Sequence, residues 1–92
     1  MTKYTIKGTS KYKKGLKLSQ KRGCDLNILR DVIDQLAQGI PLDDKYVDHP
    51  LNPPLKDHRG CHLKPNWILV YIMDKESMVL VLTNIGTHEE VY

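Results

Sequence analysis

The chain has 92 residues, a length that fits one modest soluble domain. Because 40% of the residues are hydrophobic and 27% are charged, the composition excludes disordered and low-complexity proteins. Its apolar runs fall well short of the roughly 20 residues that span a membrane, and its N-terminus lacks the apolar stretch of an export signal, so we expect a cytoplasmic protein. The net charge of +3 is unevenly spread, because residues 1–22 carry eight basic and no acidic side chains, whereas the rest carries six basic and eleven acidic ones.

The basic N-terminal part is predicted to form a strand and a helix. Apolar and polar side chains alternate over residues 3–7, as in a short strand. A helix follows, which Thr9 or Ser10 can cap and which runs to about Arg22, with Gly23 as its stop. Its lysine-rich face indicates either a polyanionic partner, such as nucleic acid or an acidic protein, or simply a solvated helix surface.

A second helix is predicted from Asp25, which can serve as its N-cap. Between Ile28 and Ile40 apolar residues recur every three or four positions, the spacing of an amphipathic helix packed on a core, and Gly39 and Pro41 end it. Because the link between the two helices is short, we expect an antiparallel helical hairpin.

The second half of the chain is predicted to be mostly β-structure. A long connection with four prolines, residues 41–57, comes first, and a loop of this length is usually functional or wraps the domain. Three strands joined by short turns then follow, at residues 58–63, 67–73 and 78–85, and the segment THEEVY closes the chain. Helices on one face of such an antiparallel meander define an α+β domain.

Histidines are the most chemically informative residues, because imidazole can give and take protons near neutral pH. The four are His49, His58, His62 and His88, and taken singly each is more typical of a surface or structural position. His58 and His62 would share one face of a strand beside Cys61, but the chain has no Cys-x-x-Cys pair. We therefore expect neither a metal site nor a cofactor, and we expect the two cysteines, Cys24 and Cys61, to be reduced and buried.

Basic and aromatic residues lie close to these histidines in the sequence. Lys56 and Arg59 could neutralise phosphate oxygens, and Trp67 and Tyr92 could stack on bases, although Trp67 also fits a core position and Tyr92 a docked terminus. Cleavage of RNA by its own 2′-hydroxyl needs a base, an acid and a cation at the phosphate. Two histidines with an arginine or lysine would supply that set.

Two segments carry a resemblance to a known family. The segments DHPLNPPLKDHRGCHLKPNWILVYIM and GTHEEVY, in this order and at this spacing, resemble the YafQ branch of the RelE-like bacterial toxins, and the resemblance covers nearly the whole chain as one domain, residues 1–92. It implies the RelE-like microbial ribonuclease fold, with an N-terminal strand and a helical hairpin packed on a four- to five-stranded antiparallel sheet.

The resemblance also implies an activity and partners. Such toxins enter the A site of the 70S ribosome and cut the mRNA there, through attack of the 2′-hydroxyl on the adjacent phosphate. A cognate antitoxin of the DinJ or RelB type wraps and blocks the toxin. The complex binds operator DNA only through the antitoxin, and no membrane is involved.

Site residues follow from the resemblance position by position. The family's catalytic positions match His49, His62, Asn66 and His88, and its RNA- or phosphate-contacting positions match Lys56, Arg59, Trp67 and Tyr92. His88 is the first choice for the general acid, and His62 or His49 for the base. Asn66 stands where the family usually has Asp, so either that carboxylate is not essential or this chain is a weakened toxin.

Within this resemblance the basic helix has a specific role. We expect Lys11, Lys13, Lys14 and Lys17 to dock on 16S rRNA through phosphate contacts. Two readings compete with a ribosome-dependent nuclease. One is an inactive homologue that only binds RNA or its antitoxin in operon control, and the other is a generic RNA-binding α+β domain.

Overall fold

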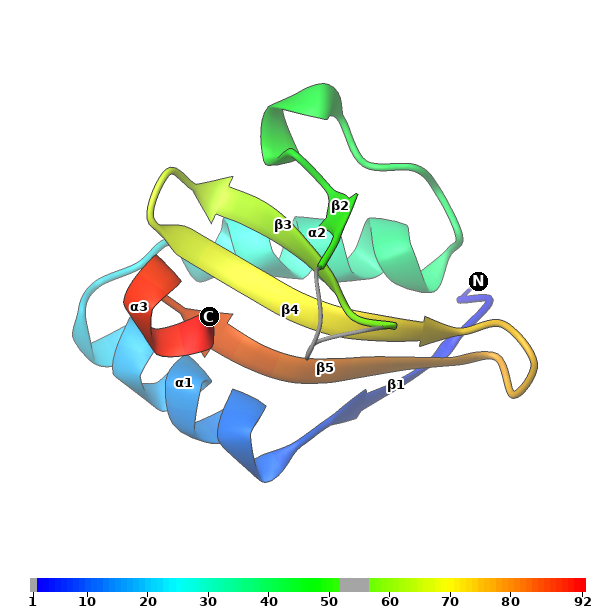
Figure 1. Ribbon diagram of the computed structural model, residues 1–92, viewed down its shortest axis with the longest axis horizontal. Helices are drawn as coiled ribbons and strands as arrows, with labels where there is room; N and C mark the ends of the chain where they lie inside the picture. The colour runs from blue at the N-terminus through cyan, green and yellow to red at the C-terminus, as the bar shows by residue number, and fades with distance from the viewer. Residues whose placement is uncertain (1, 52–56) are drawn as a thin grey trace.

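The computed structural model describes residues 2–51 and 57–92 and shows helices packed on a five-stranded sheet (Figure 1). In chain order the elements are β1 (Thr5–Gly8), α1 (Ser10–Lys21), α2 (Leu26–Ala37), the 3-10 turn η1 (Asp44–Tyr46), β2 (His49–Pro50), β3 (Arg59–Lys64), β4 (Trp67–Asp74), β5 (Val79–Gly86) and α3 (His88–Val91). The α+β class predicted from the sequence is confirmed.

The sheet has the order β1-β5-β4-β3-β2 and is mostly antiparallel. Strands β2 to β5 form an antiparallel meander, whereas β1 pairs with β5 in parallel, with Thr5 opposite Val79 and Gly8 opposite Leu82. The five-stranded, mostly antiparallel sheet that the resemblance implied is therefore confirmed, with one parallel pair at this edge. Parallel pairing needs a long crossover, which the helices and the meander between β1 and β5 provide.

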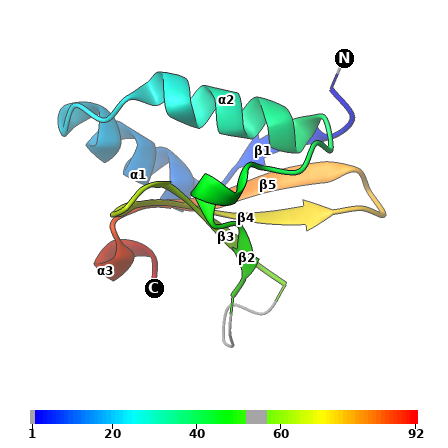
Figure 2. The ribbon, with the colours of Figure 1, turned by 90° about the horizontal axis from the view of Figure 1, so that it is seen from above.

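Helices α1 and α2 form the predicted hairpin and cover one face of the sheet (Figure 2). Thr9 caps α1 by accepting the backbone N–H of Tyr12, and Asp25 caps α2 by accepting that of Asn27. Helix α2 ends three residues before Ile40, because Gly39 adopts a positive φ of 75°.

Side-chain alternation along the strands divides the apolar residues between the two faces. The helix-side core contains Trp67, Leu69 and Tyr71 of β4, all at most 6% exposed, together with Cys61, a free thiol of β3. The intervening residues of β4 face the other side, where they form a small core with Val91 of α3 and Leu51. Strand β4 is therefore covered on both faces of the sheet.

Besides the turn η1, two short elements were not predicted from the sequence. Strand β2 lies within the long connection and pairs with the beginning of β3, and α3 folds the C-terminal segment against the face that α1 and α2 leave open (Figure 2). Both elements carry histidines, so they decide where the candidate site lies. In the described parts of the chain, every helix is too short or too polar to span a bilayer.

Gly15 allows α1 to lie directly against β5. A Cβ atom at this position would overlap the backbone carbonyl oxygen of Ile85. We expect Gly15→Ala to lower the free energy of unfolding by about 1–3 kcal/mol, even though alanine is the better helix former by ~1 kcal/mol. Urea denaturation measures this difference, and Lys14→Ala on the exposed side of α1 is the matched control. A Gly15→Ala protein as stable as the wild type would show that the helix can move away at little cost.

Candidate active site

Three of the four histidines meet on the face of the sheet opposite α1 and α2. The ring centroids of His49 and His62 are 6.0 Å apart, and those of His62 and His88 are 5.2 Å apart. The Tyr92 ring lies 5.2 Å from that of His88, and Tyr92 is 50% exposed. We call His49, His62, His88 and Tyr92 the histidine cluster. The three histidines come from β2, β3 and α3, so the fold assembles them from distant parts of the chain.

His62 lies between the other two imidazoles and has the most perturbed environment. Partial burial lowers its pKa below 6.5, and the positive charges that His88 and His49 can carry lower it further. The neutral form of His62 is thus favoured near pH 7, which suits a group that accepts a proton. Because the pKa is lower in the folded state than in the unfolded one, protonation of His62 as the pH falls below about 6.5 destabilises the fold.

His49 is oriented by a backbone carbonyl. Its Nδ1 lies 2.7 Å from the carbonyl oxygen of Val47, and because a carbonyl can only accept, Nδ1 carries the proton. In the neutral ring this leaves the lone pair on Nε2, which is free of that bond. His49 therefore remains, with His62, a candidate for the base.

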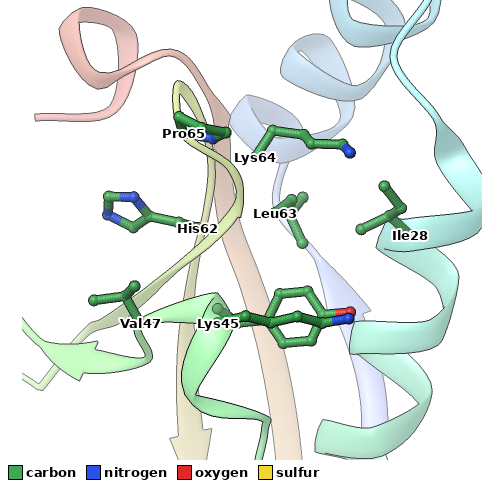
Figure 3. A pocket seen from close by; sticks show the side chains of 8 residues that line it. Ile28, Lys45, Val47, His62, Leu63, Lys64 and Pro65 are labelled. Carbon is green, nitrogen blue, oxygen red and sulfur yellow. The ribbon is translucent and has the colours of Figure 1, made fainter.

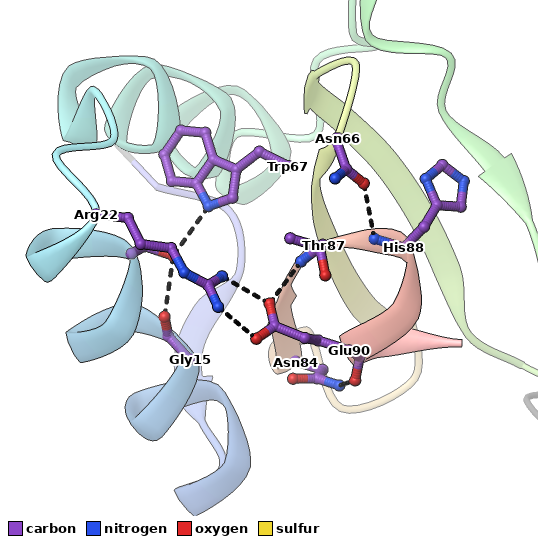
Figure 4. Close-up of polar contacts among 9 residues, drawn as sticks. Gly15, Arg22, Asn66, Trp67, Asn84, Thr87, His88 and Glu90 are labelled. Carbon is purple, nitrogen blue, oxygen red and sulfur yellow. Dashed lines mark hydrogen bonds and ion pairs between the residues drawn. The ribbon is translucent and has the colours of Figure 1, made fainter.

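Asn66 contacts the backbone of His88. Its Oδ1 accepts the His88 backbone N–H at 3.0 Å, at the first residue of α3 (Figure 4). The amide oxygen thus satisfies one of the N–H groups that a helix start leaves unpaired. An aspartate carboxylate can accept the same hydrogen bond, so this positioning function survives the Asn in place of Asp.

An ion pair joins α3 to the end of α1. Both oxygens of Glu90 accept guanidinium N–H groups of Arg22 at 2.7 Å, and Oε1 also accepts the Thr87 backbone N–H at 2.9 Å (Figure 4). The interaction with Arg22 lowers the pKa of Glu90 to about 2. Gly86 makes room for this carboxylate, because a Cβ there would lie 2.7 Å from Oε1. Together these contacts fix α3 and with it His88.

We expect Glu90→Gln to loosen α3 and to weaken the dependence of the free energy of unfolding on pH at acidic pH. A carboxylate with a pKa of about 2 when folded and 4.5 when unfolded stabilises the fold above pH 4.5, and this contribution is lost as the pH falls toward 2. Urea denaturation between pH 2.5 and 6 measures the profile, and Glu89→Gln at the exposed neighbouring position is the control. Equal pH dependence of the wild type and Glu90→Gln would contradict the account.

Arg59 and Lys56 were predicted to contact phosphate beside the histidines. Arg59 extends from the other face of β3, where its Nε donates to Asp48 Oδ1 at 3.2 Å, and Tyr71 donates to the same oxygen at 2.6 Å. This corrects the expectation that Arg59 lies beside the histidines, since residues 59 and 62 of a strand point to opposite faces. Lys56 lies outside the described residues.

Trp67 is a core residue and does not offer a surface for stacking. Its indole is 6% exposed, and Nε1 donates to Ser19 Oγ at 3.0 Å, while the Ser19 hydroxyl donates to the Gly15 carbonyl (Figure 4). The indole therefore ties β4 to α1, on the side of the sheet away from the histidine cluster. The expectation that it stacks on a base is corrected to a structural role.

The exposed side of α1 carries the four lysines for which rRNA contacts were predicted, at positions 11, 13, 14 and 17, all of them exposed.

Within residues 2–51 and 57–92, no three His, Cys, Asp or Glu side chains are grouped so that they could hold a metal ion.

The fold and the histidine cluster define a small α+β protein with a candidate acid–base site. A family model for the bacterial toxin of type II toxin-antitoxin systems, YafQ, matches residues 4–92, and the chain belongs to this family. It is 36% identical to the mRNA interferase toxin YafQ of Escherichia coli K12 over 94 residues, which cover 100% of this chain and 99% of that protein.

Solved structures of related toxins have the same fold. A metal-bound toxin from Helicobacter pylori is 44% identical, covers 100% of both chains and superposes with a TM-score of 0.91. The toxin in the E. coli DinJ-YafQ toxin-antitoxin complex is 34% identical, with 98% of each chain covered and a TM-score of 0.89.

Proposed function

We propose that this protein is the toxin of a type II toxin–antitoxin system and cleaves mRNA in the ribosomal A site in the bacterial cytoplasm. The observation that carries the proposal is the convergence of His49, His62 and His88 at 5.2–6.0 Å between ring centroids. The E. coli relative named an mRNA interferase supports the reaction class. The solved E. coli DinJ-YafQ complex supports an antitoxin partner of the DinJ or RelB type. Operator DNA is bound through that antitoxin.

The proposed reaction is an intramolecular phosphoryl transfer within the mRNA. His62 or His49, as a neutral imidazole, removes the proton of a 2′-hydroxyl, whose oxygen then forms a bond to the adjacent phosphorus. The bond from phosphorus to the 5′-oxygen breaks, and His88 in its protonated form gives its proton to that oxygen. The products are a 2′,3′-cyclic phosphate and a 5′-hydroxyl.

The two proton-transfer functions make opposite demands on the cluster. The base has to be neutral while the acid is protonated, and this state is most populated when the pKa of the base lies below that of the acid. The lowered pKa of His62 fits the base, and the exposed position of His88 at the start of α3 fits an acid that meets the leaving group. Each proton transfer of this kind contributes about 10²–10⁴-fold to a rate.

Asn66 supports a second candidate function, that of an inactive homologue which only binds RNA or its antitoxin. An amide cannot accept a proton as a carboxylate does, although it holds the backbone of His88 equally well. Induced expression in a host without the antitoxin separates the two. Growth arrest and shortened mRNA support the nuclease, whereas harmless expression that becomes toxic with Asn66→Asp supports the inactive homologue.

A further inference from the structure

A cavity of about 360 Å³ adjoins the histidine cluster at the outer edge of β3 (Figure 3). One edge of β3 pairs with β4 over its whole length, but at the other, outer edge the described residues of β2 pair with Arg59 and Gly60 alone. The rest of this outer edge borders the turn η1 and the start of α2. His62 forms one wall of the cavity, and Leu63, the following residue, belongs to the core on the other side of β3. The cavity is thus continuous with the candidate catalytic centre.

The cavity combines an apolar lining with positive charge. Ile28, Leu63 and Pro65 contribute apolar surface, and Lys45 and Lys64 extend on the side of Ile28, opposite His62 (Figure 3). None of the described residues that line it is an Asp or a Glu. An occupant with a flat, largely apolar body and a negative group at one end would match both features.

Val47 gives a second sign that this edge is shaped for a ligand. Its backbone has a φ of 48°, a left-handed conformation that is rare and costly for a β-branched residue, and its side chain is 54% exposed on the cavity. The carbonyl of this residue is the one that orients His49. The same strained residue therefore shapes both the cavity and the cluster.

We propose that this cavity is a nucleotide subsite, which takes the nucleotide next to the phosphate attacked in the histidine cluster. The base lies on the apolar lining, and the farther phosphate of that nucleotide meets Lys45 and Lys64. The proposal rests on the proposed ribonuclease function and adds where the substrate chain runs. It also gives Lys45 and Lys64 a contact with substrate that the family resemblance did not assign to them.

The test is binding of a trinucleotide whose central 2′-hydroxyl is replaced by hydrogen, so that it cannot be cleaved. Nuclear magnetic resonance of the 15N-labelled protein should show amide shifts at Val47 and Lys64. The double variant Lys45→Ser/Lys64→Ser should raise the dissociation constant at least about five-fold at low salt. The charge-matched control Lys7→Ser/Lys75→Ser, at two exposed positions away from the cavity, should change it less than two-fold. An abasic residue at the subsite should weaken binding by a similar factor.

Three results would overturn the subsite: equal losses in the two double variants, shifts confined to α1, or equally tight binding of a glutamate-rich peptide of the same charge. Failure of the proposed function is a separate outcome. In that case the trinucleotide shifts Val47 and Lys64 as expected, but ribosome-bound mRNA stays intact. If instead mRNA is cut while the cavity remains unperturbed by the trinucleotide, the nuclease stands and the subsite is wrong.

Discussion

Replacing His88 by glutamine is expected to slow the cleavage of ribosome-bound mRNA by at least about 100-fold. Glutamine keeps the backbone N–H that Asn66 accepts and has a side chain of similar reach, but it cannot donate a proton to the 5′-oxygen as an imidazolium does. Loss of one general acid typically costs about 10²–10⁴-fold. The single-turnover rate on ribosomes programmed with a defined mRNA measures the effect.

The matched control is His58→Gln, because His58 precedes β3 and is outside the histidine cluster. We expect this variant to keep the wild-type rate within about three-fold. Because His88 is exposed, we expect His88→Gln to fold as stably as the wild type. Circular dichroism and urea denaturation of the variant test this. A His88→Gln protein that cleaves within three-fold of the wild type would remove His88 from the mechanism.

The second large effect is expected on ribosome binding. Changing Lys11, Lys13, Lys14 and Lys17 to glutamate reverses the charge of the exposed side of α1. Each lysine that neutralises a phosphate releases counterions, so the logarithm of affinity falls with the logarithm of salt by about 0.7–0.9 per contact. We expect the quadruple variant to bind ribosomes at least about 100-fold more weakly at low salt and to have a much flatter salt dependence.

The control for this experiment is the change of the same four lysines to arginine. Arginine keeps the positive charge and the helix propensity, so binding and its salt dependence should stay close to those of the wild type. Filter binding of purified 70S ribosomes over a range of salt concentrations measures both variants. An unchanged affinity and salt slope in the glutamate variant would show that α1 is a solvated face.

The secondary structure was largely predictable because its signals are local. The caps Thr9 and Asp25, the three- and four-residue spacing of apolar residues in α2 and the continuous apolar run of β4 each act over a few residues. The Thr87-x-x-Glu90 capping box at the start of α3 is a local signal of the same kind. The parallel pairing of β1 with β5 was not predictable, because no local pattern specifies a partner so far along the chain.

The site was predictable only in part, and the errors have physical reasons. The alternation of side chains along β3 could have separated Arg59 from His62, whereas family resemblance placed both at the site. The ion pair between Arg22 and Glu90 joins residues 68 positions apart and leaves no trace in the local sequence. The same holds for the burial of Trp67 against Ser19, because only the packing of α1 on the sheet brings the two together.

The most direct test of the central claim is to map the ends that the protein produces on mRNA held in a ribosome with a known A-site codon. The account predicts new 3′ ends within that codon that carry a 2′,3′-cyclic phosphate, and their loss with His88→Gln. Intact mRNA on ribosomes that have bound the protein, or 3′ ends that carry a free hydroxyl, would contradict it.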